Sequence, residues 1–228
     1  FKGSLSLDCF FYFKGYWNKM SSYQQEQIDA LQMVMEHLQS LPEEDQRALA
    51  NLITEYLAFR KNVEAFLSAH LSDVCTQKCY TNRLSACCSK EGIITFFADV
   101  VINALVSSEE EMRLLARVLG ETNKGFKCIY LGADGCLWHL KPIVCEMFIC
   151  DDAQEHIFKS TPEARQKWEE FKQLKKHFSW PDRPVLFDAL EVFFMKAGYT
   201  SPLMYLHNSP GLLRVKQLAK FDNESMQP

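Results

Sequence analysis

Eight of the nine cysteines in this chain lie within one stretch, residues 75–150, and this clustering limits what the chain can fold around. They form two groups of four: Cys75, Cys79, Cys87 and Cys88, then Cys128, Cys136, Cys145 and Cys150. Clustered cysteines indicate metal or redox chemistry in a reducing compartment and structural disulfides in a secreted protein. A chain of 228 residues that is 47% hydrophobic can build a sizeable core without disulfides, so metal binding is the favoured interpretation.

Thiolates are the ligands that soft and borderline metals prefer, and four of them hold one tetrahedral zinc ion or one iron–sulfur cluster. Eight thiolates therefore serve two centres, or one centre with bystander cysteines. Adjacent Cys87 and Cys88 point in different directions in any extended backbone, so they serve different centres or one of them is not a ligand. A lone buried cysteine is commonly a small hydrophobic residue, but eight clustered cysteines do not fit that description.

The spacing of the cysteines leans slightly towards an iron–sulfur cluster. Structural zinc sites typically pair short C-x2–4-C segments, whereas Cys75-x3-Cys79 and Cys145-x4-Cys150 reach only the outer part of that range. Iron–sulfur clusters accept more varied loops, often with a proline nearby. We therefore expect a [4Fe–4S] cluster, with zinc as the alternative.

Apolar residues at helical spacing predict helices on both sides of the cysteines. Stripes at 28–38 and 49–67 predict a helical hairpin, with Pro42 at the start of its second helix. Residues 74–89 break the pattern, so the first four cysteines are expected in irregular sequence. A helix from Gly92 to Val106 is apolar nearly all round and should be the central buried one.

The middle of the chain predicts a capped helix followed by a β-hairpin over residues 126–140. The helix begins at Ser108, where Glu111 completes a capping box, and stops at Gly120. The hairpin turns at residues 132–135 and carries Cys128 and Cys136. A three-residue loop puts both cysteines on one face, where they can share a metal, and a two-residue turn puts them on opposite faces. We predict the three-residue register or a bulge.

A loop with Pro142, Cys145 and Cys150 is expected next, and the last third of the chain is helical. The expected helix starts are Thr161-Pro162, Asp182 with Pro184, and Ser209-Pro210, and a polar, disordered tail is expected after Lys220. The predicted fold class is mainly α: one helical domain, 1–228, with a small β-hairpin and a loop-built cysteine metal core. Its parts are a helical hairpin (1–70), the cysteine-cluster core (71–158) and C-terminal helices (159–228).

The central segment resembles the YkgJ-type cysteine-cluster family, which is described as a zinc- or iron-chelating domain. The resemblance covers residues 75–150 and is carried by Cys75-x3-Cys79, the doublet Cys87-Cys88, Cys128-Ile129-Tyr130-Leu131, Gly135-Cys136-Leu137-Trp138, Lys141-Pro142 and Cys145-Glu146-Met147-Phe148-Ile149-Cys150. It implies that all eight cysteines bind metal. The chain departs from the family in its wider spacing before the doublet, in Lys141 where arginine is usual, and in Glu146 where arginine is usual.

These features predict a metal-binding protein whose cysteine cluster serves assembly, metal handling or electron transfer. The alternatives are a metal-cluster-dependent protein-modifying enzyme, similar to a flagellin lysine methylase with a related cluster, and a purely structural zinc protein.

Near the cluster, His139 is a minor ligand candidate, and Trp138 and Phe148 either shield the centre or pack in the core. Lys141 either donates to the centre or to a substrate carboxylate, or is a solvated side chain. No residue stands out as catalytic.

The charge and hydropathy of the chain limit the classes of partner that we expect. The net charge is -4 with both signs dispersed, so no basic patch for nucleic acid is expected. No run of about 18 apolar residues occurs, so no transmembrane helix and no membrane partner are expected. Residues 10–13 are apolar but lack the charged start and cleavage site of a signal peptide, which favours the cytoplasm. A protein partner is compatible with the sequence, and the oligomeric state is left open.

Overall fold

The computed structural model describes residues 22–85, 87–89, 95–123, 125–159, 161–180, 182–204, 214 and 217–218. Its helical elements are α1 (Ser22–Ser40), α2 (Glu43–Leu52), α3 (Thr54–Leu71), the π-helix η3 (Ser72–Tyr80), α4 (Phe97–Val106), α5 (Glu109–Leu119), α6 (Ile143–Glu146), α7 (Asp151–Phe158), α8 (Pro162–Ser179), α9 (Leu186–Lys196) and the 3-10 turn η4 (Pro202–Met204). A two-stranded antiparallel hairpin joins β1 (Leu131–Gly132) to β2 (Gly135–Cys136). The predicted class, mainly α with a small hairpin, is confirmed. Across these residues, no helix combines the length and apolar character that crossing a membrane requires.

The N-terminal helices follow the apolar stripes with one correction. Ile28, Leu31 and Leu38 of α1 are buried as their spacing predicted. The single second helix that we predicted is two helices, α2 and α3. The Thr54 hydroxyl donates to the Ala50 carbonyl oxygen at 3.2 Å, and this kind of side-chain bond competes with the backbone ladder and bends helices.

The first two cysteines lie on a helix rather than in irregular sequence, so that prediction is wrong for them. Cys75 and Cys79 belong to η3, which continues α3 with wider turns. Hydrogen bonds between residues five apart mark these turns: Thr81 N–H donates to Thr76 at 2.8 Å and Leu84 N–H donates to Cys79 at 2.9 Å. Such π-helical turns are rare and occur frequently at functional sites.

The central helix α4 is buried as predicted, but it begins at Phe97 rather than at Gly92. The Asp99 carboxylate accepts the Phe96 backbone N–H at 3.1 Å and so fixes the first turn, with Phe96 itself in an extended conformation. Residues 90–94, where we placed the start, lie outside the described part of the chain. The next helix, α5, carries the predicted capping box, because Ser108 accepts the Glu111 N–H while Glu111 accepts the Ser108 N–H.

The hairpin has the register that we did not predict. Gly132 pairs with Gly135 and Leu131 with Cys136, so the loop holds two residues, not three. The glycine that follows the loop, Gly135, has φ of +118°, a conformation that favours glycine. Cys128 lies outside the ladder, in a turn closed by a 3.1 Å bond from the Leu131 N–H to its carbonyl oxygen. The rule that a two-residue turn puts the two cysteines on opposite faces therefore does not apply.

The C-terminal part also contains more helix than predicted. Cys145 lies on the single turn α6, and Cys150 immediately precedes α7, in a stretch that we expected to be a loop. Helix α8 begins at Pro162 after Thr161, as predicted, although Leu174 on its predicted inner face is 45% exposed. The predictions for Ser209-Pro210 and for the tail lie outside the described residues.

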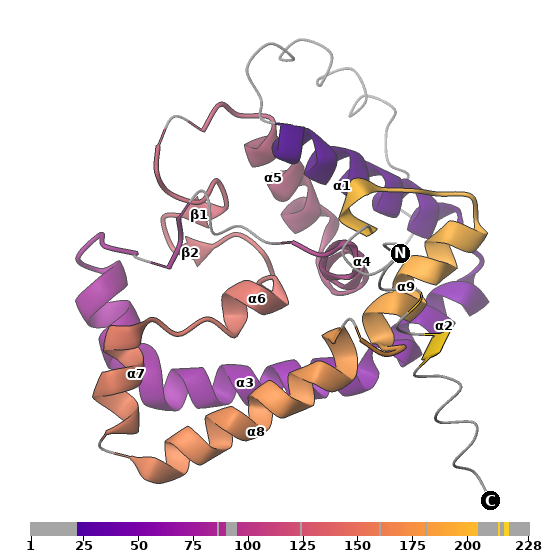
Figure 1. Ribbon diagram of the computed structural model, residues 1–228. Helices are drawn as coiled ribbons and strands as arrows, with labels where there is room; N and C mark the ends of the chain where they lie inside the picture. The colour runs from indigo at the N-terminus through magenta and orange to yellow at the C-terminus, as the bar shows by residue number, and fades with distance from the viewer. Residues whose placement is uncertain are drawn as a thin grey trace, which may run out of the picture.

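Two helical layers enclose the cysteine segment (Figure 1). Helices α3 and α8 run side by side, and aromatic pairs fill the seam between them, with Tyr56 and Phe178 ring centroids 5.3 Å apart and Phe66 stacked on Trp168 at 5.5 Å. Helix α4 packs on α1 and α9, and α1 also packs on α5. The hairpin and α6 lie between α3 and the group formed by α1, α4 and α5 (Figure 1). The stretch that carries the cysteines therefore lies beside the helical core, between these two groups of helices.

Candidate metal centre

All eight predicted ligands are reduced thiols, and no disulfide joins any of them. Their positions are Cys75 and Cys79 on η3, Cys87 and Cys88 after it, Cys128 in the turn before β1, Cys136 on β2, Cys145 on α6 and Cys150 directly before α7. Three of them, Cys75, Cys87 and Cys145, are exposed, and the other five are half-buried. The thiols therefore stand at the edge of the core and remain accessible to solvent.

Backbone pairing joins the two cysteine groups. The Cys128 N–H donates to the Cys88 carbonyl oxygen at 3.0 Å, and Ser89 and Lys127 form an antiparallel bridge beside it. The Lys127 ammonium donates to the carbonyl oxygens of Leu84 and Ser85, the latter at 3.2 Å. The segment with the cysteine doublet is thus fixed to the strand that leads into the hairpin.

A second connection links η3 to the tip of the hairpin. The Tyr80 hydroxyl donates to the Gly132 carbonyl oxygen at 3.2 Å and also contacts the Ala133 carbonyl oxygen. At the other end of the cysteine segment, α7 packs on α3, the helix that η3 continues. The helix that starts after Cys150 is therefore in contact with the helix that leads to Cys75.

Buried polar side chains of α3 and α4 hold the segment between the hairpin and α6. Asn103 donates to the Leu140 carbonyl oxygen and accepts the Leu140 N–H, both at 2.9 Å. The Arg60 guanidinium donates to the Lys141 carbonyl oxygen at 2.6 Å, and the Asp99 carboxylate accepts the Ile143 N–H at 3.1 Å. Arg60, Asp99 and Asn103 are each 4% exposed or less. They fix the start of α6, which carries Cys145, to the core.

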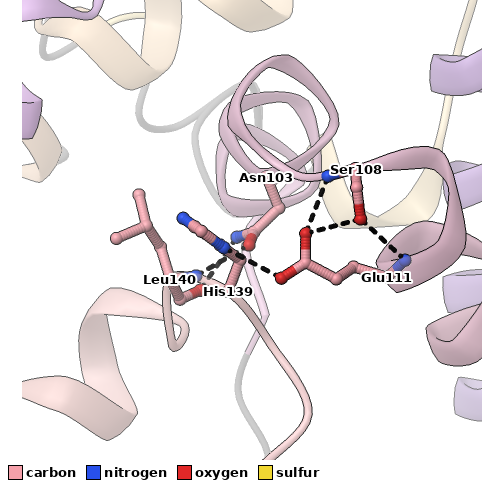
Figure 2. A network of polar contacts seen from close by, with 5 residues as sticks. All are labelled: Asn103, Ser108, Glu111, His139 and Leu140. Atoms are coloured by element: carbon pink, nitrogen blue, oxygen red, sulfur yellow. Dashed lines mark hydrogen bonds and ion pairs between the residues drawn. The ribbon is translucent and has the colours of Figure 1, made fainter.

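Figure 2 shows how the neighbouring His139 is held. Its Nδ1 lies 3.0 Å from a carboxylate oxygen of Glu111, whose other oxygen accepts the Ser108 N–H at 2.7 Å. The bonds from His139 and Ser108 lower the pKa of Glu111 to about 2. His139, our minor ligand candidate, thus joins the hairpin segment to the capping box of α5.

Burial raises the pKa of two hairpin thiols: the pKa of Cys128 rises to about 11, and the pKa of Cys136 also rises. Both side chains are half-buried and pack against the hydrophobic core. Because burial disfavours the charged thiolate, both residues favour the neutral thiol in this conformation.

Lys141 borders the thiols. Its ammonium lies 3.4 Å from the Glu146 carboxylate, which is buried, while the lysine side chain is about half exposed. Burial acts to lower the pKa of Lys141, but the Glu146 carboxylate and the nearby Cys136 and Cys88 thiolates raise it above its usual value. Lys141 is therefore an ion-paired cation beside the cysteines.

The two aromatic candidates have different environments. Trp138 is 5% exposed and packs edge-on against Tyr130, with ring centroids 5.3 Å apart, whereas Phe148 is 55% exposed. Of these two residues, Trp138 therefore packs in the core beside the hairpin, and Phe148 does not.

The donor set fits a thiophilic metal, but the coordination shell is not closed. The Sγ atoms of Cys87 and Cys88 are 4.0 Å apart. In the described part of the chain, no three cysteine, histidine or carboxylate side chains are gathered tightly enough to hold an ion in this conformation. The thiols carry the right chemistry and are reduced, and side-chain rotation would be needed to complete a shell.

Sequence reasoning missed the three anchoring side chains, Arg60, Asp99 and Asn103. A signal for two of them was present: Asp99 and Asn103 are polar residues four positions apart in the helix that we predicted to be apolar nearly all round. Polar residues on one face of a buried helix must find hydrogen-bond partners. Arg60 gave no comparable signal, because arginine is ordinary on an amphipathic helix.

Comparison of this chain with protein-family models, with curated proteins and with solved structures finds no match.

Proposed function

We propose that this protein binds a metal centre through its clustered cysteines and serves assembly, metal handling or electron transfer. The observation that carries the proposal is that eight free cysteines come from two distant stretches of chain, and that a backbone bond from Cys128 to Cys88 joins these stretches beside the hairpin.

A [4Fe–4S] cluster is the first choice of centre, and zinc is the second. The spacing of the cysteines supports an iron–sulfur centre, since such clusters accept more varied loops than structural zinc sites do. When bound, a cluster supplies one-electron chemistry, while zinc supplies a rigid structural crosslink. The chain's own residues would hold the centre, and Trp138 would exclude water from its core side.

The proposal agrees with what the resemblance of residues 75–150 to the YkgJ-type family implies, namely metal binding by these eight cysteines. A cytoplasmic location goes with this proposal, because clustered cysteines indicate metal chemistry in a reducing compartment. Its partner would be a protein, for which the dispersed charge of the surface is suitable.

The test is to purify the full chain without oxygen, record its visible spectrum, and measure iron, acid-labile sulfide and zinc. A brown protein with equal iron and sulfide supports the iron–sulfur proposal, and a colourless protein with stoichiometric zinc supports a structural zinc protein. A protein that contains neither metal, and that takes up neither on anaerobic reconstitution, would overturn the proposal.

A further inference from the structure

We infer that Cys87 and Cys88 form a redox-active dithiol, which small disulfide molecules oxidise reversibly to a disulfide between these two neighbouring residues. The inference goes beyond the proposed function, because two thiols can undergo this reaction without a metal. It concerns a modification site, and the chemical class of its reaction partner is a low-molecular-weight disulfide, written RSSR below.

The fold brings the two neighbouring sulfurs together. Successive side chains of an extended strand point to opposite faces, so the sequence predicted that these two thiols would point apart. A turn takes the place of extended backbone here, because the Cys88 N–H donates to the Ser85 carbonyl oxygen at 2.9 Å. The Sγ atoms of Cys87 and Cys88 are consequently 4.0 Å apart and in contact with each other. The prediction that the two thiols point apart is therefore wrong, and the pair is placed to react as a unit.

The turn that carries the pair is fixed on both sides. The Lys127 ammonium donates to the Ser85 carbonyl oxygen at 3.2 Å, and the Cys88 carbonyl oxygen accepts the Cys128 N–H at 3.0 Å. Arg83 and Ser85 have φ of +60° and +37°, in the left-handed region that residues other than glycine rarely adopt. Such conformations persist only where the surroundings enforce them, and they cluster at functional sites.

The two thiols differ in exposure, which gives each one a step in the reaction. Cys87 is exposed and Cys88 is half-buried, so Cys87 meets the disulfide first. Cys87 gives its proton to solvent and attacks one sulfur of RSSR, which forms a mixed disulfide and releases one RS⁻. Cys88 then loses its proton and attacks the Cys87 sulfur, which closes the new bond and releases the second RS⁻. The cysteines lose two electrons and two protons, and RSSR becomes two RSH.

The oxidised pair should be easy to reduce again. Neighbouring Cα atoms lie about 3.8 Å apart, closer than the roughly 4.4–6.8 Å usual for residues joined by a disulfide. A disulfide within this doublet is therefore strained, and Cys87 leaves it open to attack by a thiol. Strained or exposed disulfides are the labile and regulatory ones, so the reaction runs in both directions.

The experiment treats the full chain, purified without oxygen, with glutathione disulfide, blocks the remaining thiols with N-ethylmaleimide, and maps tryptic peptides by mass spectrometry. Trypsin releases residues 84–90 as one peptide, in which Cys87 and Cys88 are the two cysteines. This peptide should be lighter by two hydrogen atoms, should carry neither maleimide nor glutathione, and should accept two maleimides after reduced glutathione is added. The reaction is run on the protein as purified and again after a chelator has removed any metal that protects the thiols.

Two variants test the order of the steps. Cys88→Ser lacks the thiol that closes the bond, so Cys87 should accumulate as its mixed disulfide with glutathione. Cys87→Ser keeps the half-buried thiol, which should take up less glutathione in the same time. Cys9→Ser, outside the cluster, is the matched control and should oxidise as the wild type does. Far-ultraviolet circular dichroism checks that each variant is folded.

The outcomes separate this inference from the proposed function. A peptide 84–90 that keeps two maleimides in both preparations overturns the inference, and so does one joined by a disulfide to the peptide that contains Cys128. Metal analysis of the same samples tests the proposed function by itself. A chain that oxidises at the doublet but binds no metal, even after reconstitution, supports the inference and overturns the proposed function.

Discussion

The N–H of Cys128 donates to the carbonyl oxygen of Cys88 at 3.0 Å, so a direct backbone bond joins the two halves of the cysteine cluster. Around this bond, side chains from α3 and α4 fix the segment that leads to Cys145. The cysteines and the frame that positions them are therefore separate parts of the molecule. Loss of a ligand should empty a site, whereas loss of a frame residue should first reduce stability.

Metal removal should destabilise the protein, because metal bound by the folded state alone adds its binding energy to the free energy of unfolding. The loss should be roughly 4 kcal/mol when free metal stands a thousandfold above its Kd. Cys145→Ser and Cys150→Ser should each lower metal content and stability together. Urea unfolding with and without chelator, together with metal analysis, measures both. Unchanged metal content in both variants would contradict the assignment of these residues as ligands.

Arg60→Met should destabilise the fold by about 1–3 kcal/mol, because it removes the buried donor to the part-buried Lys141 carbonyl oxygen. It also removes the 2.8 Å bond to the Tyr56 hydroxyl. Lys61→Met, on the exposed side of the same helix, is the matched control and should change stability little. Equal stability of the two variants in urea unfolding would show that Arg60 does not anchor this segment.

Asp99 should make stability fall as pH rises from about 4 to about 6. Burial raises the pKa of its carboxyl from 3.8 to about 6, and the N–H bonds from Phe96 and Ile143 only partly offset this. The folded state therefore binds the proton more tightly than the unfolded state. The resulting stabilisation is present below the unfolded pKa and is lost as pH passes through the folded pKa. Its size is on the order of 3 kcal/mol.

Asp99→Asn isolates this effect, because the amide does not titrate and keeps one oxygen acceptor. As pH rises from 4 to 7, the unfolding free energy of the wild type, measured in urea, should fall relative to that of Asp99→Asn. The size of this fall should be the Asp99 contribution given above. Parallel pH profiles for the two proteins would rule out the raised pKa.

Glu111→Ala should cost about 1 kcal/mol, since the capping box of α5 loses the acceptor for the Ser108 N–H. Glu110→Ala removes an exposed carboxylate from the same first turn and should cost less. Because the pKa of Glu111 is lowered to about 2, its contribution is present above the unfolded pKa of 4.5 and disappears as pH falls through about 2. Thermal unfolding near neutral pH compares the two variants. An equal loss of stability in both would mean that Glu111 contributes through its charge alone and not through the capping bond.

Gly135→Ala should destabilise the hairpin by about 1–2 kcal/mol, because an L-residue at φ of +118° is strained even though no atom lies within 4 Å of the added methyl group. Gly125→Ala is the control, because that glycine has no such backbone conformation and its added methyl makes ordinary contacts at 3.7 Å and beyond. Both the unfolding midpoint and the metal content should fall for Gly135→Ala, since Cys136 is the next residue. A variant with wild-type values for both would show that the turn tolerates alanine.

Local signals predicted the elements that depend on neighbouring residues. The apolar stripes of α1 and α8, the Ser108 capping box and the position of the hairpin, though not its register, were found because each is fixed by residues within a few positions of one another. The extent of α4 was wrong because Asp99, three residues beyond Phe96, accepts the Phe96 N–H and sets the first turn. The π-helical continuation at η3 left no recognisable pattern in sequence periodicity.

The amino-acid sequence by itself determined the fold class and the ligand candidates, because helical periodicity and the reactivity of thiols are properties of residue type and spacing. Tertiary structure alone decided which cysteine-bearing segments become neighbours, because Cys88 meets Cys128, and α7, which follows Cys150, meets α3, only through packing between distant segments. It also decided that Arg60, Asp99 and Asn103 hold the cysteine segment. A buried polar group must find its partner wherever the fold brings one, and that partner can lie anywhere in the chain.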